Sequence, residues 1–102
     1  MIKDLEKFKV KLKRSIQIDK LILFGSRARG DHFLDSDVDL LIVSKAFKGS
    51  SMSERIAEIL KFWDGEVDIE PICYTPEEFR KKKDQIGIVQ QAVKEGKELA
   101  VS

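Results

Sequence analysis

The stretch Ser36-Asp37-Val38-Asp39-Leu40-Leu41-Ile42-Val43 decides the fold of this chain, because acids and apolar residues alternate in its first half. The side chains of a β-strand point alternately to opposite faces of a sheet. We therefore expect a strand over Val38–Val43 with Asp37 and Asp39 on the same face. The apolar run that follows is typical of a central strand, where two acids without a partner are costly. The alternative is an edge strand whose solvated acids prevent aggregation.

A glycine-serine turn precedes this strand. The apolar run Leu21–Phe24 predicts a buried strand that ends at Gly25-Ser26, and ten residues separate Ser26 from Asp37. Glycine lets the backbone approach a phosphate chain, and a helix that starts here presents free N–H groups to it. Arg27 and Arg29 follow at once, and each is either a phosphate ligand or a solvated helix residue.

A third carboxylate is expected from the strand predicted over Val67–Ile72. Asp68 and Glu70 alternate with apolar residues there and both compete for the role. We prefer Asp68, because apolar residues flank it on both sides whereas Glu70 precedes Pro71. Three carboxylates on neighbouring strands suit Mg²⁺, and one of them can accept the proton of an attacking hydroxyl group.

The rest of the chain predicts helices around this small sheet. Apolar periodicity indicates a helix over 2–16, and cap signals start two more at Ser51 and Thr75. A last helix is expected over 86–95, with Ile86, Val89, Ala92 and Val93 facing inward, and residues 98–101 form a short strand or a tail. The predicted fold is an α+β sandwich, and a single domain is expected over 1–102. Its mixed sheet carries helices on one face and the acids on the other.

Composition narrows the partners and the compartment. The chain has 102 residues with 19 Lys and Arg against 18 Asp and Glu, so its net charge of +1 offers no general surface for long nucleic acid. The single cysteine, Cys73, is expected to be structural, and a reducing cytoplasm suits it. No apolar run reaches the roughly 18 residues of a membrane span. The basic run Arg80–Lys83 is either a solvated helix face or a docking patch for an acidic or nucleic-acid partner.

Together, the turn Gly25–Gly30, the strand Ser36–Ile42 and the segment Val67–Ile69 resemble the DNA polymerase β-type nucleotidyltransferase superfamily. More narrowly, the chain resembles its minimal nucleotidyltransferases, small proteins usually encoded beside a HEPN-domain partner. The spacing of Gly-Ser, ten residues and Asp-x-Asp matches that family's pattern without a gap. The likeness extends over essentially the whole chain.

The resemblance implies a site that uses Mg²⁺ and a nucleoside triphosphate. The phosphate-binding pair of the family corresponds to Gly25 and Ser26, with Arg27 and Arg29 beside them as candidate nucleotide ligands. The catalytic and metal-binding carboxylates correspond to the three acids preferred above, which are Asp37, Asp39 and Asp68.

The resemblance also implies a partner. Such proteins are antitoxins that transfer AMP from ATP to a tyrosine of a HEPN ribonuclease toxin. Two alternatives stay open: an antitoxin that masks the toxin without catalysis, and a nucleotidyltransferase that acts on a small molecule or an RNA end. The identity of the nucleotide base also stays open. So does the oligomeric state, which is either a homo-oligomer or a hetero-oligomer.

Overall fold

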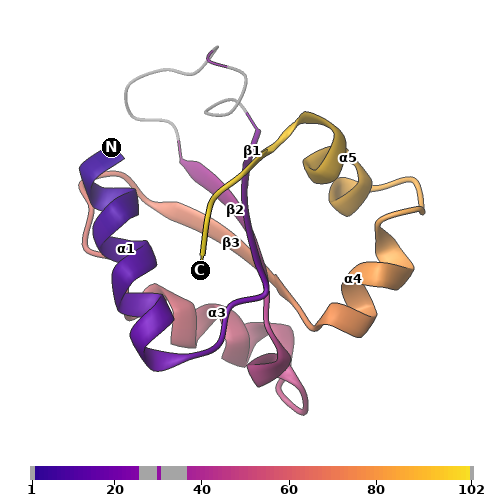
Figure 1. Cartoon of the computed structure of the whole chain (residues 1–102), viewed down its shortest axis with the longest axis horizontal. Coiled ribbons are helices and arrows are strands. Elements are labelled where there is room, and N and C mark those ends of the chain that lie inside the picture. The colour runs from indigo at the N-terminus through magenta and orange to yellow at the C-terminus, as the bar shows by residue number, and fades with distance from the viewer. Residues whose placement is uncertain (1, 26–29, 31–36, 102) are drawn as a thin grey trace.

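A four-stranded mixed sheet forms the centre of the computed structural model, which describes residues 2–25, 30 and 37–101 (Figure 1). The strand order is β3-β2-β1-β4. Strand β1 runs antiparallel to both of its neighbours, whereas β2 and β3 run parallel. The strands are β1 (Lys20–Phe24), β2 (Val38–Val43), β3 (Ile69–Tyr74) and β4 (Lys97–Glu98). The mixed sheet predicted from the sequence is confirmed.

Helices follow the cap signals of the sequence. At Ser51 and Thr75 the side chain accepts a hydrogen bond from the backbone three residues on, and Glu54 and Glu78 complete the two capping boxes. Among the described residues, no helix is long and apolar enough to cross a membrane. The helices are α1 (Ile2–Ser15), the short 3-10 helix η1 (Lys45–Phe47), α3 (Met52–Leu60), α4 (Pro76–Lys82) and α5 (Ile88–Glu95).

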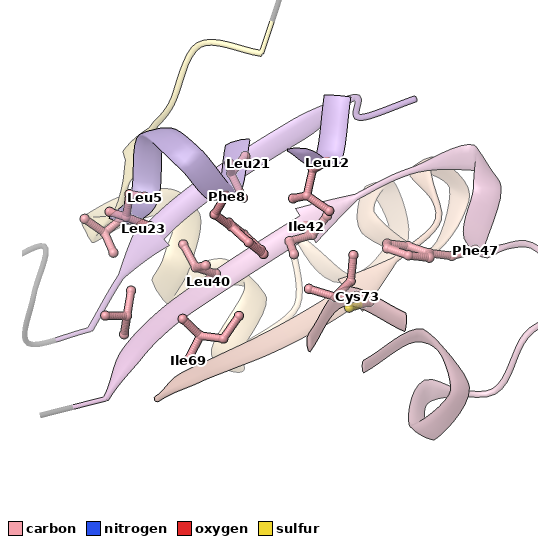
Figure 2. Packing of buried hydrophobic residues seen from close by; sticks show 12 residues of the cluster. Leu5, Phe8, Leu12, Leu21, Leu23, Leu40, Ile42, Phe47, Ile69 and Cys73 are labelled. Carbon is pink, nitrogen blue, oxygen red and sulfur yellow. The ribbon is translucent and has the colours of Figure 1, made fainter. Parts of the chain in front are cut away.

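The larger hydrophobic core lies between the sheet and helices α1 and α3. Figure 2 shows Phe8 and Leu12 of α1 pointing toward Ile42 of β2. The Phe8 ring also meets the Trp63 ring edge-on, with 5.6 Å between ring centroids. Since all of these core side chains except Trp63 are almost completely buried, α1 and α3 hold one face of the sheet away from water.

A second core lies on the opposite face, so the prediction that helices cover only one face was wrong. Helices α4 and α5 lie on the other side of the sheet from α1 and α3 (Figure 1). They place Phe79 and Val89 against Leu41 and Val43 of β2. These two β2 residues share a face with the acids and are apolar, so this half of the face needs a cover. The acid-bearing end remains outside this second core.

Strand β3 begins two residues later than predicted. Before it, the indole N–H of Trp63 donates to the Val67 carbonyl over 2.7 Å, and Gly65 lies against the same ring. A side chain at Gly65 would come within 2.4 Å of the Trp63 ring. The chain is therefore folded onto Trp63 up to Val67, and regular pairing with β2 starts at Ile69.

Helix α5 also differs from the prediction at its start. Val89 and Ala92 are buried as expected. Ile86 instead lies before the helix and is 99% exposed, and Val93 is 44% exposed. Only a narrow stripe of α5 faces the sheet, so two of the four predicted inward residues point to solvent.

A buried arginine connects α3, β3 and α4. Arg55 of α3 donates to the Cys73 carbonyl over 3.0 Å and to the Glu78 carboxylate over 2.7 Å. The arginine is 7% exposed, and its Nε atom has no hydrogen-bond partner among the described residues. The hydrogen bond from Arg55 and, after it, the one from the Thr75 backbone hold the pKa of Glu78 below its ordinary value.

We predict that Glu78→Gln lowers the free energy of unfolding by about 1–2 kcal/mol at pH 7. Glutamine keeps the capping hydrogen bonds but leaves Arg55 without a counter-charge. Because the folded-state pKa of Glu78 lies below its ordinary 4.5, the stabilisation is present above pH 4.5 and is lost as pH falls through the folded-state pKa. Urea titrations at pH 7 and pH 3 measure this change.

The matched control is Glu77→Gln, since Glu77 is an exposed acid in the same helical turn. It is expected to change stability by less than about 0.5 kcal/mol. An equal loss in both variants, or a Glu78→Gln loss that persists at pH 3, would contradict the role of the ion pair.

Candidate active site

Asp39 lies at the junction of three strands. It pairs with Phe24 of antiparallel β1 on one side and with Glu70 of parallel β3 on the other. Phe24 is the last residue of β1, so the next residue, Gly25, is brought to the Asp39 carboxylate. The structure thus brings together the glycine of the predicted phosphate turn and one predicted metal ligand.

Asp37, Asp39 and Glu70 form one acidic cluster at this end of the sheet. The pKa of Glu70 is raised above its ordinary value. The main cause is hydrogen bonding with the Asp37 side chain. Glu70 is exposed, but a small loss of hydration and the negative charges of Asp39 and Asp37 act in the same direction. Neighbouring carboxylates repel one another, and this repulsion favours the protonated form of Glu70.

Asp68 occupies a different position from Glu70. Both residues are exposed, but Asp68 precedes the first residue of β3 whereas Glu70 lies within the strand. The Asp68 backbone carbonyl accepts a hydrogen bond from the Val38 amide over 2.9 Å, so its main chain continues the β2–β3 pairing. The charges that act on Glu70 come from Asp37 and Asp39. The parallel register of β2 and β3 therefore pairs Glu70 with Asp39, and this signal was not available from residue spacing alone.

The donor set of the cluster fits a hard divalent cation. Carboxylate oxygens are preferred ligands of Mg²⁺, and a cation bound among them would offset their repulsion. Within the described ranges, however, no three acidic, His or Cys side chains are already arranged around one metal position. Any metal site here needs the carboxylates to reorient, and it can draw further ligands from a bound phosphate chain.

Gly25 is required by its backbone angle and by the lack of space. Its φ is +75°, in the left-handed region that favours glycine. A Cβ atom there would lie 2.2 Å from Oδ2 of Asp39. The absence of a side chain thus lets the strand end meet the carboxylate. The other residues predicted to bind the nucleotide, Ser26, Arg27 and Arg29, lie outside the described residues.

Cys73 and Tyr74 have side chains that can act as nucleophiles, but both lie away from this cluster. Cys73 is completely buried, and burial raises the pKa of its thiol to about 12, which supports the structural role predicted for it. Tyr74 ends β3 and pairs with Val43. It is four residues along β3 from Glu70, about 13 Å at the rise of a strand. Neither side chain contributes to the acidic cluster.

The sequence matches a model of the nucleotidyltransferase domain over residues 5–97. The protein therefore belongs to the nucleotidyltransferase domain family. This match confirms the family recognised from the glycine-serine turn and the Asp-x-Asp strand.

A relative from Methanocaldococcus jannaschii bears the name "Putative protein adenylyltransferase". It is 40% identical over 60 residues, which are 57% of this chain and 61% of the relative. The chain thus spans less than two thirds of that relative's length.

Two solved structures have a fold similar to that of this chain. A structure described as a putative nucleotidyltransferase from Sulfolobus solfataricus is 33% identical, with a TM-score of 0.57 over 81% of this chain and 77% of that one. A structure described as a toxin–antitoxin with AMP-PNP is 23% identical. It has a TM-score of 0.55 over 95% of this chain and 73% of that one, and it supports the fold alone.

We predict that Gly25→Ala destabilises the protein more than Gly30→Ala. Both glycines have positive φ, so each alanine costs about 1–2 kcal/mol of backbone strain. Only at Gly25 does the new methyl group meet a carboxylate, whereas nothing described lies within 4 Å of Gly30. We expect about 1 kcal/mol of additional loss at Gly25. Urea unfolding of the two variants measures the difference.

A double-mutant cycle separates the clash from the backbone strain. In an Asp39→Ala background, Gly25→Ala should cost no more than Gly30→Ala, because the carboxylate is gone. If the extra cost at Gly25 persists without Asp39, the contact between the turn and the carboxylate is not its cause.

Proposed function

We propose that this protein is a Mg²⁺-dependent nucleotidyltransferase that transfers AMP from ATP to a hydroxyl group of a partner protein. The observation that carries the proposal is the meeting of Gly25, Asp39 and Glu70 at the junction of β1, β2 and β3. A phosphate-binding turn beside clustered carboxylates suits the polarisation of an α-phosphate. Membership of the nucleotidyltransferase family supports the same reaction class.

Each part of the site has a role in this reaction. Asp37, Asp39 and Glu70 would hold Mg²⁺, which when bound stabilises the charge that develops on the transferred phosphate. Gly25 lets the end of β1, which leads into the proposed phosphate turn, approach the Asp39 carboxylate closely. The acceptor oxygen forms a bond to the α-phosphorus, the bond to pyrophosphate breaks, and the acceptor proton passes to a carboxylate of the cluster.

We assign the third carboxylate to Glu70, with Asp68 as the alternative preferred from the sequence. The register supports this choice, since Glu70 is paired with Asp39 whereas Asp68 precedes the strand. The carboxyl groups of Asp37 and Asp39 also raise the pKa of Glu70, which supports placing Glu70 in their cluster. Mutation of each residue in turn separates the two candidates.

A partner protein is the acceptor that the comparisons favour. The Methanocaldococcus relative is named as a protein adenylyltransferase, and a toxin–antitoxin structure shares the fold. Tyr74, the only tyrosine of this chain, lies too far along β3 from the cluster to serve as its own acceptor. We therefore propose a tyrosine of a HEPN ribonuclease toxin as the target, with this protein as the antitoxin and the cytoplasm as the compartment.

We predict that Asp39→Asn reduces AMP transfer to the neighbouring gene product by at least about 100-fold. The change keeps the shape of the side chain and removes the charge that a metal ion requires. The assay follows label from α-labelled ATP with Mg²⁺, and chelation by EDTA should abolish the signal. A mutant that does not transfer but still protects cells from the toxin would instead support masking. Absence of label on the wild-type partner would refute the proposed reaction.

A second pair of variants identifies the third carboxylate. We predict that Glu70→Gln lowers kcat by about 100-fold, because it removes one charge from the cluster. Asp68→Asn serves as the matched control and should stay within about threefold, since Asp68 is also exposed but precedes the strand in which Glu70 pairs with Asp39. The same labelled-ATP assay measures both. The opposite ranking would return the role to Asp68.

A further inference from the structure

An exposed apolar turn precedes helix α5. Ile86 is 99% exposed and Ile88 is 49% exposed, and Gly87 joins them with a φ of +159°, at the border of extended backbone. Large aliphatic side chains are usually buried, and an almost completely exposed isoleucine has a cost in water. Ile86 and Ile88 on this turn provide an apolar contact point for another molecule.

Hollows on both sides of this turn make the contact point concave. A hollow of about 510 Å³ lies along α5 and is lined by Ile86, Ile88, Gln91 and Lys94, among others. A smaller one of about 80 Å³ lies on the α4 side and is lined by Ile86, Tyr74 and Lys82, among others. The Lys82 ammonium group lies 5.6 Å from the centre of the Tyr74 ring, which holds one wall of this hollow in place. A side chain of a partner can therefore enter beside each isoleucine.

The positive charge around the turn indicates the chemistry of the partner that it can bind. Residues 80–95 contain five Lys and Arg residues against two acids, although the whole chain has a net charge of only +1. Lys82 and Lys94 each line one of the two hollows. A segment that combines apolar side chains with Asp or Glu complements this surface. A second copy would bring one basic surface against another, which is unfavourable.

Helix α5 connects this turn to the acidic cluster. The helix ends at Gly96, where an added Cβ would lie 2.8 Å from the Leu23 carbonyl. The residue after Leu23 is Phe24, which pairs with Asp39. The eight residues of α5 span about 12 Å, so a molecule that lies along the helix reaches from Ile86 to the acid-bearing end of the sheet.

We propose that Ile86, Ile88 and Lys94 form the docking surface for the protein acceptor, and that they bind a segment of it with apolar and acidic side chains. This inference rests on the proposed function, which supplies the acceptor. It explains how a chain of this size positions a protein substrate: the acceptor binds along α5 and presents its hydroxyl group at the carboxylates. Of the basic run Arg80–Lys83, Lys82 lies at this surface, because it lines the hollow beside Ile86.

The test compares Ile86→Asp with Val10→Asp in binding to the neighbouring gene product, a HEPN-domain protein in the proposed function. Both residues are exposed, but Val10 lies on α1, on the opposite face of the sheet. We expect the Kd measured by interferometry to rise at least tenfold for Ile86→Asp and less than twofold for Val10→Asp. Lys94→Glu should also raise the Kd, and added salt should weaken wild-type binding. Thermal unfolding confirms that the variants fold.

The outcomes separate docking from catalysis. If the wild type binds the partner without transferring AMP, the proposed reaction fails while the Kd series still tests the surface. If transfer occurs and Ile86→Asp leaves both Kd and KM for the partner unchanged, the docking surface is refuted and the reaction stands. Absence of wild-type binding would overturn the docking proposal. So would a wild-type dimer that Ile86→Asp dissociates, because the surface would then join two copies.

Discussion

The position of Asp39 between an antiparallel and a parallel neighbour is the constraint on which the rest of the structure depends. The antiparallel pairing with β1 brings the end of that strand, and hence Gly25, to one side of the carboxylate. The parallel pairing with β3 brings Glu70 to the other side. A mixed sheet with this strand order therefore brings Gly25 and the acidic cluster together. A sheet with different neighbours for β2 would separate the same residues.

The two hydrophobic cores explain why the acids remain at one end of the sheet. One face of β2 is apolar along its length and is covered by α1 and α3. The other face changes from acidic to apolar between Asp39 and Leu41, and α4 and α5 cover its apolar half. The carboxylates thus lie at the border between a packed surface and water. At such a border the carboxylates belong to neither core, so a cation from solvent can reach them.

Local signals predicted most of the fold. The capping boxes at Ser51 and Thr75 involve residues three apart, so they act wherever the chain goes. Period-two alternation likewise assigned β2 and the common face of Asp37 and Asp39. The start of β3 was missed because Trp63 holds the chain up to Val67, and that contact depends on folding around the indole ring.

The residues of the Gly-Ser turn and the Asp-x-Asp strand were enough to recognise the family, since that pattern is written in consecutive positions. The partner of Asp39 on the next strand was decided by the tertiary structure. A shift of one residue in the register of β3 would exchange the faces of all its side chains, and spacing along the chain does not contain that register. The exposure of Ile86 is of the same kind. Helical periodicity assigned it to the core, but the packing of α5 on β1 and β2 left it in solvent.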